Sequence, residues 1–326
     1  MRTRQLGRTG AVVGEVGLGA WQLGADWGEV SEADALATLN AAVDAGTTFI
    51  DTADVYGDGR SERVIARLLR ERRDVPLTVA TKMGRRVAQE PSAYQLDNFR
   101  AWTDRSRANL GVDVLDLVQL HCPPTPVFST DAVFDALDTL VAEQRVRAYG
   151  VSVETCDEAL TAIARPGVAT VQIILNMLRL KPLERVLPAA AAAGVGIIAR
   201  VPLASGLLSG RYDEHTTFAP DDHRSFNRHG EAFDVGETFS GVPFEVGLAA
   251  VRRLAAASPG PTLAQVALRW ILDQEGVSVV IPGARNPPQA AANAAAADLP
   301  PTTDEFRRSV TETYNELIAP HVHNRW

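Results

Sequence analysis

Short apolar runs recur along the whole chain, and most of the gaps between them are long enough for one helix. Eight such runs, rich in β-branched residues, lie at 16–18, 47–50, 77–80, 115–120, 148–151, 170–174, 195–199 and 277–281. Polar residues do not alternate with apolar ones inside these runs, which is typical of strands that are covered on both faces. The pattern therefore predicts eight buried strands.

Most of the intervening segments carry a helical pattern with a start or a stop signal. Ser31 precedes apolar residues that are spaced three and four positions apart, and Gly46 follows them, as expected for an N-cap and a C-terminal glycine. Further helical patterns open at Ser61 and extend over 94–110 and 183–193. Strands that alternate with helices in this way predict an α/β protein with a parallel sheet.

Two architectures fit this alternation, an open doubly wound sheet and a closed (β/α)8 TIM barrel. No Gly-x-Gly-x-x-Gly follows the first run, as a dinucleotide-binding open sheet would suggest, so the barrel is favoured. The absence of a linker predicts a single domain over 1–326. Segment 4–13 turns at Gly10 and predicts an N-terminal β-hairpin that could serve as a lid. Stretch 209–241, the long loop after strand 7, is too long for an ordinary connection, so it is either functional or disordered.

Polar residues fall at or directly after the apolar runs. In a barrel these positions are the carboxyl ends of parallel strands, which converge on one face where active sites are built. We therefore expect one site that brings together Asp51, Lys82, His121, Ser152, Gln172, Arg200 and the segment 283–285.

The residue types in this set suggest acid–base chemistry centred on Tyr56. A phenol has a pKa near 10 in water, so it needs a neighbouring cation, and Lys82 can be that cation. Asp51 would keep Lys82 charged, and His121 can donate a hydrogen bond to a substrate oxygen or relay a proton. Together they suit proton delivery to a carbonyl oxygen, while the hydride must come from a cofactor. Asp54 is the other acidic residue that could take the role of Asp51, and we interpret it as a loop residue.

Composition narrows the class of protein. The chain has 326 residues, 46% hydrophobic and 22% charged, which is ordinary for a globular protein. Its net charge of -8 argues against nucleic acid as a partner, and no run approaches the roughly 18 apolar residues of a membrane helix. The N-terminus does not resemble a secretory signal. Cys122 and Cys156 are too few for a disulfide framework or a zinc cluster, so we expect a protein of the reducing cytoplasm. The oligomeric state stays open.

Six segments resemble the motifs of the aldo-keto reductase superfamily. They are FIDTADVYG at 49–57, ATKM at 80–83, LVQLH at 117–121, YGVS at 149–152, VPLASGLLSG at 201–210 and IPGAR at 281–285. The resemblance implies a (β/α)8 barrel that holds NADP(H), uses no metal and reduces the carbonyl group of a small molecule. It also implies a catalytic tetrad of Asp51, Tyr56, Lys82 and His121, in which Tyr56 is the general acid in reduction.

The resemblance also implies a cofactor site. Ser152 and Gln172 would hold the nicotinamide carboxamide, and a second group would line the pyrophosphate: Pro202, Leu203, Gly206 and Arg211. The adenosine end would be formed by Gly283, Arg285, Gln289 and Asn293. Because Arg285 suits a 2′-phosphate, NADP(H) is favoured over NAD(H). Three positions depart from the family pattern: Val153 replaces an asparagine, Ala292 an acidic residue, and Asn286 a serine or threonine.

Three features leave alternatives open. Arg200 stands where relatives have an aromatic residue, so it could stack on the nicotinamide and favour NADPH, or it could point away and pair with a carboxylate. Trp21 would line the substrate pocket or belong to the core. Trp326 would dock on the barrel or on the pocket rim. The rival functions are a Schiff-base enzyme that uses Lys82 and a catalytically slow NADP(H)-binding regulatory protein.

Overall fold

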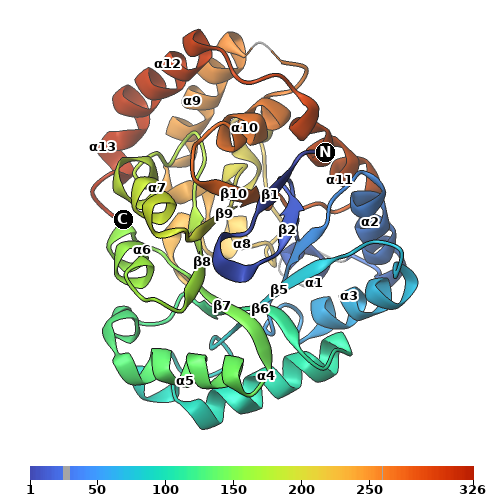
Figure 1. The fold of residues 1–326 in the computed structure, drawn as a ribbon. Coiled ribbons are helices and arrows are strands. Elements are labelled where there is room, and N and C mark those ends of the chain that lie inside the picture. The colour runs from blue at the N-terminus through green and yellow to red at the C-terminus, as the bar shows by residue number, and fades with distance from the viewer. Residues whose placement is uncertain (25–29, 259) are drawn as a thin grey trace.

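A closed barrel of parallel strands forms the centre of the molecule (Figure 1). The computed structural model describes residues 1–24, 30–258 and 260–326. The eight strands follow one another in chain order and comprise β3 Leu18–Gly19, β4 Phe49–Asp51, β5 Thr78–Met83, β6 Leu115–His121, β7 Val146–Ser152, β8 Val168–Ile174, β9 Gly196–Arg200 and β10 Val277–Val280. Parallel bridges from Val16 to Val280 and from Gly19 to Gly283 join the two edge strands. The predicted (β/α)8 fold is confirmed.

Helices surround the barrel (Figure 1). They are α1 Trp21–Gly24, α2 Glu32–Asp44, α3 Arg60–Glu71, α4 Leu96–Leu110, α5 Asp131–Ala142, α6 Cys156–Ile163, α7 Pro182–Ala193, α8 His223–Phe226, α9 Phe244–Ala257, α10 Leu263–Leu272, α11 Pro287–Ala294, α12 Asp304–Thr313 and α13 Ala319–Val322. The Ser31 hydroxyl accepts from the amide of Asp34 and caps α2, as predicted. Ser61 does not open α3. The helix follows Gly59 in a left-handed conformation, and the buried Ser61 hydroxyl donates to the carbonyl oxygen of Ala20 at 3.1 Å.

Six of the eight strands end one or more residues beyond their apolar runs, whereas β8 ends with its run and β10 ends one residue before it. Asp51, His121, Ser152 and Arg200 are each the last residue of their strand rather than the first residue after it. Backbone pairing continues through these positions, with His121 opposite Ser152 in the ladder. A polar side chain does not interrupt a ladder, because the ladder consists of backbone bonds, so the ends of the apolar runs placed these boundaries too early.

The barrel interior is apolar near the amino ends of the strands and polar near their carboxyl ends. A separate apolar cluster has most of its members in the amino halves of the strands or in the N-terminal segment, and it comprises Leu6, Val13, Phe49, Ala80, Leu117, Ala148, Ala169, Ile198, Val279 and Ile281. Leu6 and Val13 come from the predicted N-terminal hairpin, which is observed as β1 Thr3–Gln5 and β2 Val12–Gly14. The hairpin therefore closes the end of the barrel opposite the polar residues, and it is no lid over them.

The long loop after β9 is folded rather than disordered. It contains α8, which the Asp222 side chain caps by accepting from the amide of Arg224. The Asn227 side-chain oxygen accepts from the amides of Ala232 and Phe233, at 2.8 and 2.9 Å. These bonds replace the regular ladders that the loop lacks and bring it back across the barrel mouth. Among the described residues, no helix is both long enough and apolar enough to span a membrane.

Candidate active site

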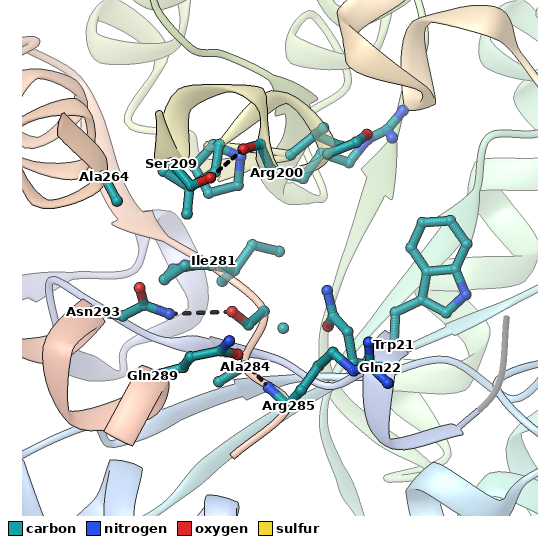
Figure 2. Close-up of a pocket in the computed structure, with 18 of the residues that line it drawn as sticks. Trp21, Gln22, Arg200, Ser209, Ala264, Ile281, Ala284, Arg285, Gln289 and Asn293 are labelled. Atoms are coloured by element: carbon teal, nitrogen blue, oxygen red, sulfur yellow. Dashed lines mark hydrogen bonds between the residues drawn. The ribbon is translucent and has the colours of Figure 1, made fainter. Parts of the chain in front are cut away.

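A cavity of about 460 Å³ opens at the carboxyl ends of the strands (Figure 2). Its wall includes Trp21, Asp51, Tyr56, His121 and every residue for which a cofactor contact was expected, namely Ser152, Gln172, Arg200, Pro202, Leu203, Gly206, Arg211, Gly283, Arg285, Gln289 and Asn293. Among the expected residues, only Lys82 is not part of this wall. The structure thus brings together side chains from strands, loops and the two helices α1 and α11, which are far apart in the sequence.

Lys82 lies beneath the cavity and links two of the expected residues. It is 1% exposed, and its ammonium contacts the carboxylate of Asp51 and donates to the carbonyl oxygen of Thr52 at 2.9 Å. The Tyr56 hydroxyl lies 3.4 Å from the same ammonium. Burial is the largest influence and would lower the pKa of Lys82, but the negative charge of Asp51, together with Tyr56 and the hydrogen bonds to both, outweighs it and raises the pKa. Lys82 is therefore a charged group at neutral pH.

Asp51 is held by two side-chain amides as well as by Lys82. The Gln119 amide nitrogen donates to its Oδ2 at 3.1 Å, and that of Gln172 donates at 2.8 Å. A buried carboxylate is costly unless its lone pairs are satisfied, and these donors satisfy them. Gln172 thus supports Asp51 while its side chain also lines the cavity.

Asp54, the rival to Asp51, is separate from this network. It lies in the turn after β4, and its amide donates to the carbonyl oxygen of Lys82 at 3.1 Å. Its two carboxyl oxygens are buried without a hydrogen-bond partner among the described residues. Burial, together with the charge of Glu62, raises the pKa of Asp54 to about 7. Its interpretation as a loop residue agrees with this placement.

Tyr56 is enclosed by aromatic rings. The Trp21 indole stacks on it at 6.0 Å between ring centroids, and the His121 imidazole meets it edge-on at 5.9 Å. Burial raises the pKa of Tyr56 above its ordinary value, although the nearby charge of Lys82 acts in the opposite direction. Burial and the positive charges of Arg85 and Lys82 lower the pKa of His121 well below its ordinary value. Near neutral pH the cavity therefore presents a protonated phenol and a neutral imidazole.

Arg200 both pairs with a carboxylate and lines the cavity, so neither of its two expected roles excludes the other. Its Nη2 donates to Glu154 Oε2 at 2.8 Å and to the carbonyl oxygen of Val153 at 3.1 Å. Glu237 Oε1 lies 3.7 Å from its Nη1. The buried Nε has no hydrogen-bond partner in the described part of the chain. Arg85 pairs with the same two carboxylates, at 3.3 and 3.0 Å.

The opposite end of the cavity is formed by the loop after β10 and by α11 (Figure 2). Gln289 Oε1 accepts from the amide of Arg285 at 2.9 Å, and the Asn293 amide nitrogen donates to the carbonyl oxygen of Gly283 at 3.1 Å. Asn286 caps α11 by accepting from the amide of Gln289. These side chains fix the loop backbone. The Arg285 guanidinium forms no ion pair within ranges 1–24, 30–258 and 260–326.

Sequence reasoning missed several residues of this site. Gln119 had a usable signal, because it lies two positions before His121 in the same strand and must face the same side. Glu154 and Glu237 had none. Glu154 lies just past the strand end that was considered, and Glu237 lies in a loop whose course no periodicity predicts. Cys122 lies beside His121, and burial raises the pKa of its thiol to about 12, so the thiol is neutral.

A family model, a curated protein and solved structures all match most of this chain. The model of the "Aldo/keto reductase family" matches residues 15–314. Aldo-keto reductase YhdN of Bacillus subtilis (strain 168) is 30% identical over 296 residues, which cover 89% of this chain and 86% of that protein. The structure of the glycerol dehydrogenase AKR11B4 from Gluconobacter oxydans superposes with a TM-score of 0.78 at 29% identity and covers 99% of this chain and 97% of its own. The holo form of AKR11C1 from Bacillus halodurans gives 0.77 at 25%, with 96% of each chain covered.

Proposed function

Because the chain belongs to the aldo/keto reductase family, we propose that it reduces aldehydes or ketones to alcohols, with a hydride from NADPH and a proton from Tyr56. One observation carries the proposal. The buried Lys82 ammonium contacts Asp51 and lies 3.4 Å from the Tyr56 hydroxyl, which faces the cavity. This contact gives a phenol the cation that it needs to release a proton near neutral pH.

The cavity suits a nicotinamide dinucleotide. Its volume of about 460 Å³ is of the size that ligand pockets have, and Trp21 and Asn293 lie at opposite sides of it (Figure 2). Two glycines keep its wall open, because a Cβ at Gly206 would lie 2.2 Å from the Tyr212 hydroxyl and one at Gly283 would lie 2.1 Å from the Gln22 side chain. The guanidinium of Arg285 suits a 2′-phosphate, which favours NADP(H) over NAD(H). When bound, such a cofactor supplies the hydride that no side chain can supply.

The residues around the reacting carbonyl then have distinct roles. Tyr56 gives its proton to the carbonyl oxygen, and Lys82 stabilises the phenolate that results. Asp51 keeps Lys82 charged and holds it in place. His121, as a neutral imidazole, can donate a hydrogen bond to the same oxygen. In the oxidation of an alcohol, the Tyr56 phenolate takes the proton back.

Two rival roles are less well supported. A Schiff-base reaction requires a neutral lysine, whereas Asp51 raises the pKa of Lys82 and keeps it charged. A regulatory protein that only binds the cofactor would not need the Asp51–Lys82–Tyr56 contacts.

We also propose a single-domain cytoplasmic protein that uses no metal. Both cysteines are free, as is usual in a reducing compartment. The described residues include one group of possible metal ligands, Cys122, Glu154 and Glu237. Its two carboxylates are paired with Arg85 and Arg200, which occupy the positions that a cation would need.

The proposal is tested by mixing the protein with NADPH or NADH and a panel of small aldehydes and ketones, and by following the loss of dihydronicotinamide absorbance. We expect turnover with NADPH for at least one carbonyl compound and little turnover in the Tyr56→Phe variant. Cofactor binding without turnover of any compound would contradict the proposal and favour the regulatory role.

A further inference from the structure

The Trp326 side chain docks on the segment that forms the rim of the cavity. It is 6% exposed, and its Nε1–H donates to Asp234 Oδ1 at 3.1 Å. Asp234 opens a short stretch of the long loop, residues 234–241, which we call the rim segment. Trp326 therefore contacts the rim, which is one of the two positions expected for it.

The backbone of the rim segment lies against the indole on both sides of Glu237. A Cβ at Gly241 would lie 2.3 Å from Trp326 Cη2, and a Cβ at Gly236 would lie 2.5 Å from Arg179 Nη1 and 3.1 Å from Trp326 Cζ2. Contacts this close leave no room for a side chain at either glycine. The indole and the guanidinium on its face therefore fix where the backbone that carries Glu237 runs.

Glu237 in turn reaches the nicotinamide end of the cavity. Its carboxylate is 8% exposed and lies 3.0 Å from Arg85 Nη2 and 3.7 Å from Arg200 Nη1. Its carbonyl oxygen accepts from the Ser205 hydroxyl at 2.9 Å. A displacement of the rim segment would therefore remove one of the two carboxylates that hold Arg200.

A second route runs from Trp326 to the other carboxylate. The Arg179 guanidinium lies 3.7 Å from the centroid of the indole, and its Nη2 donates to the carbonyl oxygen of Glu154 at 2.7 Å. Arg179 is 2% exposed and forms no ion pair in the described ranges. The face of the indole is therefore a main partner of this buried cation. Both routes end at Arg200, one through Glu237 and the other through Glu154.

We propose that Trp326 is a positioning residue for the nicotinamide end of the cavity. It acts through the rim segment and through Arg179, and it holds Glu237 and Glu154 against Arg200. This inference rests on the proposed function, because it is the binding of NADPH that makes the position of Arg200 matter.

The first test needs no cofactor. Trypsin can cleave the long loop after Arg224 and Arg228, so the rate of cleavage there reports how firmly the loop is held. We expect Trp326→Ala to speed this cleavage about tenfold, by loss of a desolvated cation–π contact and a hydrogen bond. The matched control is Phe134→Ala. Phe134 lies on α5, away from the cavity, and its buried ring packs under the guanidinium of Arg165. That control should leave the cleavage rate in the loop unchanged.

The second test measures the dissociation constant of NADPH from its own fluorescence, for Trp326→Ala, for Glu237→Gln and for the double variant. We expect each single variant to weaken binding several-fold. Because Trp326 acts partly through Glu237, the two effects should overlap. The increase in the dissociation constant of the double variant should therefore be smaller than the product of the two single increases. Trp326→Phe keeps a ring over Arg179 but loses the bond to Asp234, and it should show an intermediate loss.

A variant on the other side of the contact keeps the test decisive if Trp326→Ala does not fold. Gly236→Ala leaves Trp326 in place but adds a methyl group 2.5 Å from Arg179 Nη1 and 3.1 Å from Trp326 Cζ2. It forces the rim segment away from both partners, so it should reproduce the faster cleavage and the weaker binding. The inference would be overturned if Trp326→Ala or Gly236→Ala gave the same cleavage rate and the same NADPH dissociation constant as the control Phe134→Ala. It would also be overturned if the loss of affinity in the double variant equalled the product of the two single losses. If the wild-type protein does not bind NADPH, the proposed function fails, whereas the cleavage rates still decide whether Trp326 holds the rim.

Discussion

The two ends of the cavity are built on different principles. At the acid–base end, side chains at the ends of strands bond to one another, and Asp51 accepts from Lys82, Gln119 and Gln172. At the end formed by the loop after β10 and by α11, which we propose holds the adenosine, side chains bond to the backbone of their own loop, as Gln289 does with the amide of Arg285. The first end is a buried network whose members depend on one another. The second is a shaped loop that presents a guanidinium, so changes there should affect affinity rather than chemistry.

The substitution Tyr56→Phe should have the largest effect, and it tests whether the acid–base end affects chemistry rather than affinity. It removes the proton donor but keeps the aromatic ring that stacks on Trp21, so the cavity should keep its shape. We expect kcat to fall by about 100- to 10,000-fold, the usual worth of a general acid, while the dissociation constant of NADPH changes by less than about twofold. Steady-state kinetics and a fluorescence titration with NADPH measure the two quantities. A loss of affinity as large as the loss of kcat would show that Tyr56 is mainly a binding residue.

The second prediction concerns the mutual dependence of Lys82 and Asp51. Lys82→Met leaves the Asp51 carboxylate buried without its cation, which should cost about 3–5 kcal/mol of unfolding free energy and nearly all activity. Adding Asp51→Asn removes the buried charge, so the double variant should regain most of the stability and none of the activity. Urea unfolding and a turnover assay separate the two effects. A double variant as unstable as Lys82→Met would contradict the account of the network.

The third prediction concerns the adenosine end. Arg285→Gln should weaken NADPH binding by about 10- to 150-fold, because a charged hydrogen bond to the 2′-phosphate contributes about 1.5–3 kcal/mol. Binding of NADH, which has no such phosphate, should be nearly unchanged, and so should kcat at saturating NADPH. Titrations with both dinucleotides provide the test. Equal losses for both would mean that Arg285 contacts another part of the cofactor.

The fourth prediction concerns Arg200, which pairs with two carboxylates and also lines the cavity. A guanidinium should tolerate the neutral dihydronicotinamide better than the positively charged oxidised ring. In Arg200→Tyr, the dissociation constant of NADP⁺ should therefore fall relative to that of NADPH, by about two- to tenfold if the charges lie near 4 Å in a partly screened site. An unchanged ratio would show that Arg200 serves only to pair with Glu154 and Glu237.

The smallest expected effect is that of pH. Burial raises the pKa of Tyr56 and lowers that of His121, so both keep the protonation state needed for reduction across the neutral range. We expect kcat for reduction to change by less than about twofold between pH 6 and 9, when NADPH and the carbonyl compound saturate the protein. A tenfold fall for each pH unit above 7 would mean that Lys82 lowers the pKa of Tyr56 more than burial raises it.

The comparison also explains which parts could be predicted from the sequence. The fold and the positions of Asp51, Lys82 and His121 follow from strand ends, since a parallel barrel brings every carboxyl end to one face. Glu237 could not be predicted, because its loop is shaped by isolated contacts such as the one between Asn227 and the amide of Phe233. The role of Arg200 stayed open for a similar reason, as its partner Glu154 follows β7 in a segment without periodicity.

Some errors of detail have equally local causes. The hairpin at 4–13 was correctly predicted, but its position was not, because no turn signal tells which end of a barrel a hairpin covers. Strand ends were placed too early wherever a polar residue such as Ser152 ends a strand, since polarity changes before backbone pairing stops. The prediction of one domain over 1–326 stays a prediction.

The central claim is that one cavity joins a hydride donor to the Tyr56 proton donor, and isotope transfer tests this most directly. The protein is given NADPH that carries deuterium at the transferable position, together with an aldehyde that the activity screen shows to be reduced. We predict an alcohol with one deuterium on the carbon that was the carbonyl carbon of the aldehyde, and we expect Tyr56→Phe to form it far more slowly. Alcohol without deuterium, or equal rates for the two proteins, would contradict it.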